Sequence, residues 1–462
     1  MKSVITVASI FLCVAGIACG QEKQEKQEKQ EKQEQQHEQE GGLFSDQPGD
    51  QPGGLFSAVS QLSPAEVASG WRWLFDGTST DSWRGYRSEA FPEQGWSIED
   101  GCLKVAAGGG GGDIMTRNQY GDFELMLEWK VSPGANSGIM YGVTEKHGAS
   151  WQTGPEYQVL DDAGHNAKPT DMHSAGALYD LCAPSADKVS RPVGEWNTTR
   201  IRMQNGQIQH WLNGVKVVEC AMEGEDWAQR IAGSKFNAYE GFGIQPKGAI
   251  ALQDHGNDVW FRNIKIRDLS APMPGEINLF NGKNLNGWTY HLNGEAMMTE
   301  VWSVTDDGVL VCKGNPIGYM RTIEDYTNYV LKLEWRFDPE KGAGNSGVLL
   351  RMIGEDTVWP KSVEAQLHSG NAGDFWCIQE FPMMTDEARR NGRNTKKTHF
   401  AERPLGEWNE YEIIVNGSDI TLKVNGEILN RAWEVQETPG KICLQSEGAE
   451  IHFRNIRLVP IK

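Results

Sequence analysis

The residues with the clearest capacity for chemistry are a carboxylate, an amide and a histidine that lie far apart in the sequence. Glu156 and Gln158 stand two positions apart in the segment that follows Gly154-Pro155. Side chains two apart in a strand point to the same face of a sheet, where a carboxylate and an amide could hold sugar hydroxyls by hydrogen bonds. A solvated sheet face carries the same residue types, so the pattern by itself leaves both interpretations open.

The histidine is His255, in the segment Gln253-Asp254-His255-Gly256, which directly precedes an alternating run over residues 259–266. The ordinary pKa of histidine lies near neutral pH, so His255 is a candidate catalytic acid or base. Gln253 is a candidate hydrogen-bond donor to a substrate. A lone histidine in a loop is usually a surface residue, and that alternative stands beside the catalytic one.

Three further residues are candidates for substrate binding. Asn136 is expected at the start of a strand near the same face, although Asn-Ser-Gly is also a common turn sequence. Asp161 closes the segment that contains Glu156. Trp151 could stack against a sugar ring.

An internal repeat shows how the chain is organised. Seven motifs of the first half return in the same order in the second half, at a period of about 200 residues, which indicates a duplicated domain rather than a solenoid. The pairs are Leu74–Gly77 with Leu279–Gly282, Trp96–Ile98 with Trp302–Val304, Leu127–Trp129 with Leu333–Trp335, Asn136–Ile139 with Asn345–Val348, Gly194–Asn197 with Gly406–Asn409, Asn213–Gly214 with Asn425–Gly426, and Phe261–Ile264 with Phe453–Ile456.

The elements that must position these residues are predicted to be strands. Apolar and polar residues alternate over 123–129, 199–203, 208–212, 215–218 and 259–266. Asn213-Gly214 and Asn425-Gly426 stand between such runs, which predicts tight hairpins. Helical signals are limited to 63–68 and 386–391. Many short strands indicate an all-β fold of two tandem jelly-roll sandwiches, one over 63–270 and one over 276–462, joined at a proline-rich linker.

The N-terminus resembles an export signal. Lys2 precedes an apolar run over residues 4–18, and small residues end it, so residues 1–20 are predicted to be a signal peptide. Residues 17–20 resemble the lipobox of bacterial lipoproteins, in which Cys19 would be lipidated, although Gly16 stands where that pattern favours leucine. Simple cleavage without a lipid is the alternative.

Residues 21–62 are predicted to be a polar linker. Its first half repeats Gln-Glu-Lys with almost no apolar side chain, so it cannot offset the entropy of ordering. A linker behind a signal predicts an exported protein of the periplasm or cell envelope, with or without a lipid anchor in the membrane. The formal charge of −19 disfavours nucleic acid and anionic membrane surfaces as partners. The sequence leaves the oligomeric state open.

Taken together, the ordered motifs resemble the 3-keto-disaccharide hydrolase domain family. The resemblance covers residues 71–268 and 277–459 and rests on the shared order of Leu-Phe-Asp-Gly, Asn-Ser-Gly-Ile, Gly-x-Glu-x-Gln, Gly-Glu-Trp-Asn, Asn-Gly and Phe-Arg-Asn-Ile. It implies the concanavalin A-like lectin/glucanase sandwich. It also implies an oligosaccharide or glycoside substrate oxidised at C3, with cleavage of the neighbouring glycosidic bond.

The resemblance adds two candidate catalytic residues. The segment from Asp171 to Tyr179 is similar to the family's His-x-x-Gly-Ala-x-Tyr loop, which offers His173 and Tyr179. The second copy reads Ser-Gly-Asn-Ala-Gly-Asp-Phe over 369–375 and lacks both, and it also lacks a counterpart of His255. The first domain is therefore expected to be the active one. The second is expected to assist binding or line a shared cleft, and His368 keeps open a second functional domain with altered specificity.

The implied substrate suggests a mechanism in which a base removes the proton at C2 and the enolate expels the group at C1, followed by addition of water. The base would be His255 or His173, the acid Tyr179 or Glu156, and the hydrogen-bond donor Gln158 or Gln253. The sequence indicates no cofactor with certainty, and a divalent metal held by residues such as Glu156, Asp161, His173 and His255 could replace the amides in stabilising the enolate. A lectin-like binding protein and a conventional two-carboxylate glycoside hydrolase are the alternatives.

Overall fold

The computed structural model describes residues 61–244, 247–273 and 275–462, and most regular elements within them are strands. The predicted signal peptide with Cys19, and nearly all of the linker at 21–62, lie outside the described residues. Among the helices that are described, none combines the length and the apolar character that crossing a membrane requires.

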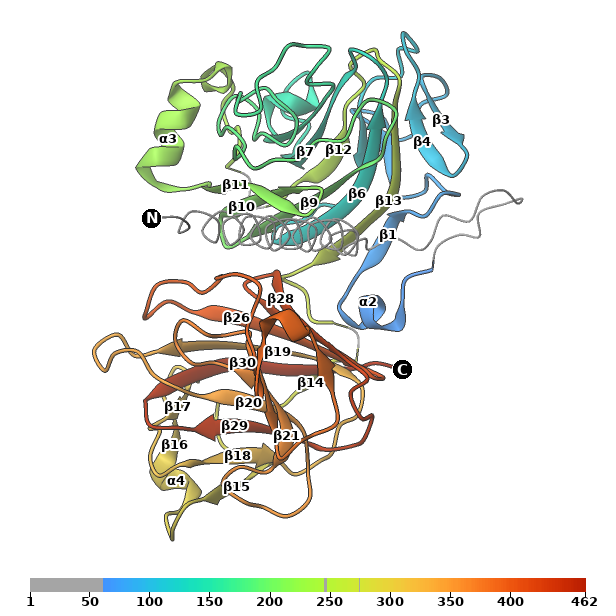
Figure 1. Ribbon diagram of the computed structural model, residues 1–462. Helices are drawn as coiled ribbons and strands as arrows, with labels where there is room; N and C mark the ends of the chain where they lie inside the picture. Colours follow the sequence, from blue (N-terminus) through green and yellow to red (C-terminus); the bar gives the residue numbers. More distant parts are fainter. Residues whose placement is uncertain (1–60, 245–246, 274) are drawn as a thin grey trace, which may run out of the picture. The chain divides into compact units, whose positions relative to one another are not determined.

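The first sandwich consists of a larger and a smaller antiparallel sheet (Figure 1). The larger sheet runs in the order β11 (Val215–Ala221), β10 (Gln207–Leu212), β9 (Asn197–Gln204), β6 (Phe123–Val131), β13 (Val259–Asp268), β4 (Cys102–Val105) and β3 (Trp96–Glu99), and β1 (Arg72–Phe75) also pairs with β13. The smaller sheet runs β2 (Trp83–Gly85), β5 (Ile114–Thr116), β12 (Ala249–Leu252), β7 (Asn136–Val143) and β8 (Glu156–Leu160).

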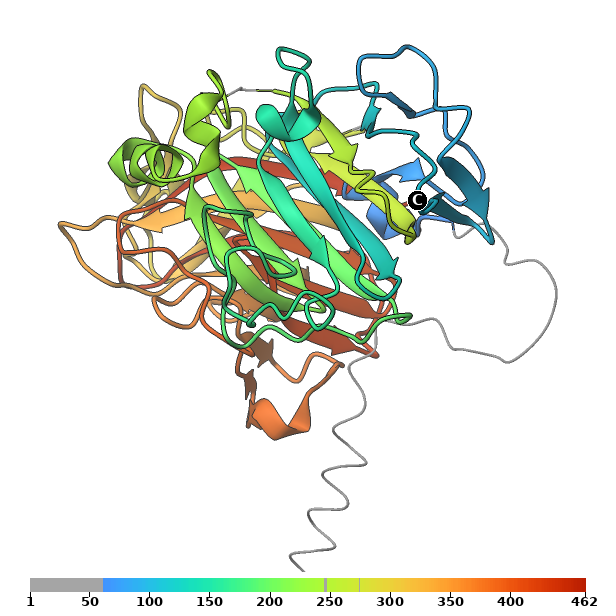
Figure 2. The same cartoon turned by 90° about the horizontal axis from the view of Figure 1, so that it is seen from above.

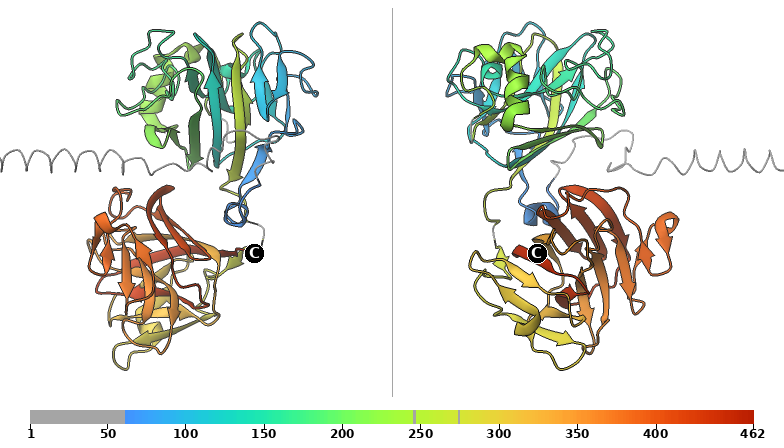
Figure 3. Two further views of the ribbon diagram at one scale, coloured as in Figure 1. Left: turned by 45° about the vertical axis from the view of Figure 1, so that its right-hand side comes forward. Right: turned by 90° about the vertical axis from the view of Figure 1, so that its left-hand side faces the viewer.

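The second sandwich repeats this plan (Figure 3). One sheet runs β16 (Trp302–Val304), β17 (Leu310–Cys312), β30 (Ile451–Pro460), β19 (Tyr329–Phe337), β26 (Asn409–Asn416), β27 (Asp419–Val424), β28 (Glu427–Trp433) and β23 (Met384–Thr385), and β14 (Ile277–Asn278) pairs with β30. The other runs β15 (Trp288–Leu292), β18 (Gly318–Thr322), β29 (Lys441–Ser446), β20 (Gly347–Ile353), β21 (Lys361–Gln366), β22 (Phe375–Ile378), β25 (Asn394–Thr395) and β24 (Arg390–Asn391). The predicted all-β fold of two tandem jelly-roll sandwiches is confirmed.

Short helices occupy the loops and ends. They are α2 (Pro64–Ala68), α3 (Gly224–Ala232) and α4 (Met298–Val301), with the 3-10 turns η1 (Ser150–Gln152), η2 (Lys235–Ala238) and η3 (Glu387–Arg389). The helical signal at 63–68 is confirmed as α2, which Ser63 and Glu66 cap reciprocally. The signal at 386–391 was wrong beyond one 3-10 turn, because the chain enters β24 at once. Helix α3, at the edge of the first sandwich in Figure 2, was not predicted.

The two Asn-Gly pairs form the predicted hairpins. Asn213 and Gly214 have φ angles of 49° and 83°, and Asn425 and Gly426 have 50° and 84°. Positive φ at both central residues matches the right-handed twist of the strands they connect, and Asn-Gly adopts it at low cost. The turns join β10 to β11 and β27 to β28, and they set the register at that end of each pair directly, with Leu212 opposite Val215 and Val424 opposite Glu427.

Each sandwich encloses its own apolar core between its two sheets. Trp83, Trp129 and Phe261 pack in the first core, and Trp302 and Trp335 pack in the second. Because strand side chains alternate, the residues between these core positions lie on the outer faces of the sheets.

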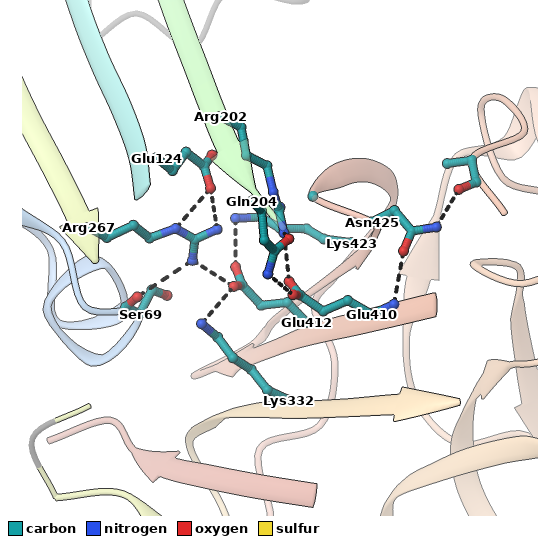
Figure 4. Close-up of polar contacts among 12 residues, drawn as sticks. Ser69, Glu124, Arg202, Gln204, Arg267, Lys332, Glu410, Glu412, Lys423 and Asn425 are labelled. Atoms are coloured by element: carbon teal, nitrogen blue, oxygen red, sulfur yellow. Dashed lines mark hydrogen bonds and ion pairs between the residues drawn. The ribbon is translucent and has the colours of Figure 1, made fainter. Parts of the chain in front are cut away.

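The larger sheets of the two sandwiches meet through a buried ion network (Figure 4). The Arg267 guanidinium on β13 donates to Glu124 Oε2 at 2.6 Å and to Glu412 Oε2, on β26 of the second sandwich, at 2.6 Å. Lys332 and Lys423 also approach the Glu412 carboxylate, at 3.4 and 2.9 Å. A single arginine thus joins carboxylates from both domains.

Further polar contacts extend this interface. Arg202 donates to Glu410 Oε1 at 3.1 Å, and Lys216 Nζ lies 2.6 Å from Glu427 Oε1. An apolar cluster adds Ala68 and Met273 against Val330 and Val459. The contact therefore uses the outer faces of the larger sheets, so the outer faces of the smaller sheets lie on the sides of the two sandwiches remote from it.

Candidate functional site

The smaller sheet of the first sandwich carries two rows of side chains on its outer face. Opposite residues in antiparallel strands point to the same side, so the registers define each row. One row contains Met115, Ala251, Met140 and Glu156. The next contains Gln253, Gly138 and Gln158, with Asp113 at its end, directly before β5. The sheet thus sets polar residues beside an apolar floor.

Gly138 leaves the space in which the Glu156 carboxyl group lies. A Cβ atom at position 138 would be 2.1 Å from Glu156 Oε1 and 2.7 Å from its carboxyl carbon. The Glu156 side chain therefore leans across the strand into the row that contains Gln253.

Burial keeps the Glu156 carboxyl group largely protonated at neutral pH. The side chain is 4% exposed, and none of the described residues donates a hydrogen bond to its carboxyl oxygens. Desolvation raises the pKa of Glu156 to about 8, the Lys235 ammonium opposes this rise, and the neighbouring Asp113 carboxyl adds to it.

A cleft of about 490 Å³ opens beside these rows. Its wall includes Trp151, Gln253 and His255 among the residues that the sequence singled out. The other lining residues are Gly85, Tyr86, Ser88, Pro92, Gly111, Gly112, Asp113, Gly148, Ala149 and Asp254. Glycine-rich segments before β5 and near η1 thus form much of the rim.

Asp113 links His255 to Glu156 electrostatically. Its carboxylate accepts hydrogen bonds from the Ser150 hydroxyl and from the Asp254 backbone N–H, the latter at 3.0 Å. Burial raises the pKa of Asp113, its two hydrogen bonds and the charge of His255 lower it, and the charge of Asp254 raises it. The histidine and the two carboxyl groups are therefore close enough for their charges to interact.

Lys235 is a cation that the sequence did not point to. Its ammonium lies 4.8 Å from the Trp151 ring centre and 4.3 Å from that of Tyr179. Cations bind the faces of aromatic rings favourably. Lys235 thus connects the wall of the cleft with Tyr179 and faces the Glu156 carboxyl group.

The loop predicted to supply His173 and Tyr179 packs against β8. The Tyr179 N–H donates to the Glu156 carbonyl at 3.0 Å, and the His173 and Tyr179 rings lie 4.7 Å apart. His173 is half exposed and pairs with Asp180 at 3.1 Å and Asp171 at 3.4 Å. The Tyr179 backbone therefore lies beside Glu156, and none of His173, Tyr179 and Glu156 is among the residues that line the cleft.

The remaining candidates divide into a pair and a separate residue. Gln158 Nε2 donates to Asn136 Oδ1 at 3.1 Å, and the buried Gln158 Oε1 has no partner among the described residues. Asp161 points elsewhere. It accepts a hydrogen bond from the Gly134 N–H at 2.7 Å and so holds the turn before β7.

The four residues considered as metal ligands do not converge. In the part of the chain that the structure describes, Asp338, Glu450 and His452 are the three residues whose ligand atoms lie within 4.8 Å of one another. They belong to the second sandwich. Glu156, Asp161, His173 and His255 form no such group within the described ranges.

With the geometry established, the chain can be compared with known proteins. The sequence profile of a family described as the 3-keto-alpha-glucoside-1,2-lyase-like domain matches residues 70–267 and 275–459. The chain belongs to this family. Both sandwiches are thus copies of one 3-keto-alpha-glucoside-1,2-lyase-like domain, as the internal repeat indicated.

One relative of the chain has a named activity. A 3-keto-disaccharide hydrolase of Bacteroides thetaiotaomicron is 37% identical over 233 residues, which span 44% of this chain and 79% of that protein. A crystal structure from Parabacteroides distasonis ATCC 8503, of a protein named as a candidate glycosyl hydrolase, is 33% identical, with 46% of this chain and 99% of that chain covered and a TM-score of 0.42. A β-glucanase of Bacillus licheniformis is 14% identical, with 41% and 99% covered and a TM-score of 0.30.

Proposed function

We propose that the protein is a carbohydrate-active hydrolase whose first sandwich binds a 3-keto glycoside in the cleft between Trp151 and His255. The observation that carries this proposal is that the Asp113 carboxyl group interacts electrostatically with both His255 in the cleft wall and the protonated Glu156 carboxyl group. Proton donors and acceptors placed together serve reactions that remove one proton and deliver another. The names of the family and of the Bacteroides relative support the substrate class.

The proposed reaction begins at the carbon next to the ketone. The C3 carbonyl acidifies the C2–H bond, a base removes that proton, and the electron pair forms an enolate on the C3 oxygen. The enolate then returns its electrons to form a C1–C2 double bond as the C1–O bond breaks, and the departing oxygen receives a proton. Water adds across the double bond, with its oxygen at C1 and a proton at C2, so the net change is hydrolysis.

The residues of the first sandwich divide into three roles. His255 is the base at C2, since it lies in the cleft wall. Glu156 is the acid for the leaving oxygen, because its raised pKa keeps a proton available at neutral pH. Lys235 and Gln253 supply positive charge and a hydrogen bond to the enolate oxygen, which is the type of stabilisation that such intermediates need.

The remaining side chains of the cleft fit the binding of a sugar ring. Trp151 offers a flat aromatic face. Trp151 packs against the buried Met115 and Met140, which support its ring without lining the cleft, and Ser150 is bonded to the Met140 sulfur. A sugar ring has apolar C–H faces and polar edges, so it matches the Trp151 face within a polar rim.

A second candidate function has an observation in its favour. Asp113 and Glu156 are two carboxyl groups on one face, and a glycosidase that uses a carboxylate pair needs one protonated group, for which the raised pKa suits Glu156, and one ionised group, which the hydrogen bonds to Asp113 favour. Such an enzyme would leave the C2–H bond intact.

Turnover in D₂O separates the two reactions. Elimination followed by hydration places deuterium at C2 of the released sugar, which mass spectrometry and NMR detect, whereas a carboxylate pair leaves C2 unlabelled. The background exchange of the ketone is measured without enzyme. Turnover with unlabelled C2 would reject elimination, and glycan binding with no turnover in any tested 3-keto glycoside would favour a binding protein.

We also propose that the protein is exported to the periplasm or cell envelope, on the strength of the N-terminal apolar run and polar linker. Radiolabelled palmitate incorporated by the full chain, and lost in Cys19→Ser, would support a lipid anchor. Secretion without label would support simple cleavage, and retention in the cytoplasm would reject export.

A further inference from the structure

The second sandwich repeats the geometry of the site with different residues. In its smaller sheet, Leu349 pairs with Glu364 and Gly347 pairs with Gln366, as Met140 pairs with Glu156 and Gly138 with Gln158 in the first copy. The face therefore keeps a glutamate, an amide and a glycine in the same arrangement.

Gly347 leaves room for two side chains. A Cβ atom at position 347 would be 2.2 Å from Gln445 Oε1 and 2.5 Å from Glu364 Oε1. The amide of Gln445 and the carboxyl group of Glu364 thus both lie over this glycine, on the outer face of the sheet.

The Gln445 amide is buried and lacks the hydrogen-bond partners that a buried amide usually has. The residue is 1% exposed, and neither its nitrogen nor its oxygen forms a hydrogen bond of ordinary geometry with the described residues. The buried Asn345 Oδ1 is unpartnered as well. Buried amides are rarely left unpaired in folded proteins, and those that are often serve a ligand.

The chemistry of this face differs from that of the first. Glu447 occupies the place of His255, and Tyr319 occupies that of Asp113. The Tyr319 hydroxyl donates to Asp356 at 2.8 Å, and Arg321 binds the same carboxylate at 2.8 Å. The face has therefore lost the counterpart of His255, although His291 on β15 lies directly opposite Tyr319, 5.9 Å away between ring centres.

Burial leaves Glu364 largely uncharged and Glu447 about half charged at pH 7. Desolvation raises the pKa of Glu364 to about 8 and the charge of Glu447 adds to the rise, whereas the close approach of the Gln445 amide and the charge of Arg393 oppose it. Desolvation raises the pKa of Glu447 to about 7, although Asn345 hydrogen-bonds to it. A face of mostly uncharged acids and unpaired amides favours a neutral ligand rich in hydroxyl groups over a charged one.

We propose that Glu364, Gln445 and Glu447 form a second carbohydrate site, which binds an unoxidised pyranoside without cleaving it. The hydroxyls of the sugar donate to Gln445 Oε1 and Asn345 Oδ1 and accept from Gln445 Nε2. A ketone could not donate to these oxygens, whereas a hydroxyl does. This proposal stands independently of the reaction assigned to the first sandwich.

Saturation-transfer NMR on the full chain tests the proposal with four methyl glycosides: α- and β-glucopyranoside, galactopyranoside and mannopyranoside. At least one should bind the native protein. Gln445→Met should weaken that binding at least tenfold and leave the melting temperature unchanged or higher, since it removes an unpaired buried amide. Gln229→Met, which changes an exposed glutamine on α3, is the control and should keep the binding, whereas Gln253→Met reports any binding that takes place in the first sandwich.

A second variant covers the case in which Gln445→Met fails to fold. Glu447 is only half buried, so Glu447→Ala should fold and should also weaken binding at least tenfold. The proposal is overturned if none of the four glycosides binds, if Glu447→Ala or a folded Gln445→Met binds as the native protein does, or if Gln253→Met alone abolishes binding.

Discussion

Replacing Glu156 by glutamine removes the proposed proton donor and keeps the shape of the side chain. We expect kcat on a 3-keto glycoside with an alcohol leaving group to fall by about 10²- to 10⁴-fold, the usual contribution of a positioned acid. With 4-nitrophenol as the leaving group the loss should be far smaller, because nitrophenolate departs without a proton. The contrast between the two substrates is the diagnostic quantity.

The size of the effect follows from the burial of Glu156. Its pKa is raised by desolvation to about 8, from an ordinary 4.5. At pH 7 roughly 90% of the groups then carry the proton, against roughly 0.3% at the ordinary value, so burial increases the acid form about 300-fold. The kcat of the native protein should therefore decline as the pH rises through about 8, and the glutamine variant should lack that decline.

Stopped assays of released alcohol and absorbance assays of released nitrophenol give kcat for both substrates across the pH range. Glu195→Gln, an exposed glutamate near β9, is the matched control and should behave as the native protein. A loss of equal size on both substrates, or a decline near pH 8 that persists in Glu156→Gln, would refute the assignment of Glu156 as the acid.

Other expectations concern the space around Glu156, the buried charges and the domain contact. Gly138→Ala should push the Glu156 carboxyl group aside and lower kcat at least tenfold, with little change in melting temperature. Gly233→Ala is the control, because the added methyl group meets its neighbours only at ordinary contact distances, and it should change neither kcat nor the melting temperature. Normal kcat in Gly138→Ala would contradict the packing described. Because the pKa of Glu156 is higher in the folded state, the free energy of unfolding of the native protein should fall as the pH rises from 4.5 to about 8. Glu156→Gln should therefore melt at a higher temperature than the native protein at pH 9, with a gain on the order of a few kcal/mol in the free energy of unfolding, and at nearly the same temperature at pH 4. Arg267→Met should lower the free energy of unfolding by about 3–5 kcal/mol in denaturant titrations, because it leaves the buried Glu124 and Glu412 without this cation. Lys104→Met, which removes an exposed ion pair with Glu99, should cost less than about 1 kcal/mol. Equal effects would show that the network is not buried. Burial raises the pKa of Glu410, but the charges of Arg202 and Lys332 outweigh burial and bring the pKa down to about 2. The stability that ionised Glu410 contributes is therefore present above pH 4.5 and lost as the pH falls toward 2, so melting curves should show a lower melting temperature at pH 3 than at pH 6.

The sequence predicted the strands and hairpins well because both depend on local rules. Alternation placed Glu156 and Gln158 on one face, and Asn-Gly specified the turns. The same alternation puts Asp161 on the opposite side from Glu156, a signal that could have separated it from the other candidates. In agreement with this, the Asp161 carboxylate accepts a hydrogen bond from Gly134 in the turn before β7 and does not join the other candidates.

Asp113 and Lys235 were missed for a different reason. Asp113 follows a run of glycines that reads as a flexible loop, and only the pairing of β5 with β12 brings it beside Gln253. Lys235 follows α3, whose amphipathic pattern is short, and its position over Trp151 depends on packing between segments far apart in the chain. No local pattern encodes contacts of this kind.

The contact through Arg267 also limits how the protein can engage its ligands. The larger sheets are in contact at Glu124 and Glu412, and the two proposed sugar sites lie on the smaller sheets, on the faces remote from this contact. One short oligosaccharide then cannot span both, so joining the domains brings no chelate gain for small sugars. If both proposed sites bind sugar, one protein molecule can hold two separate glycans at once.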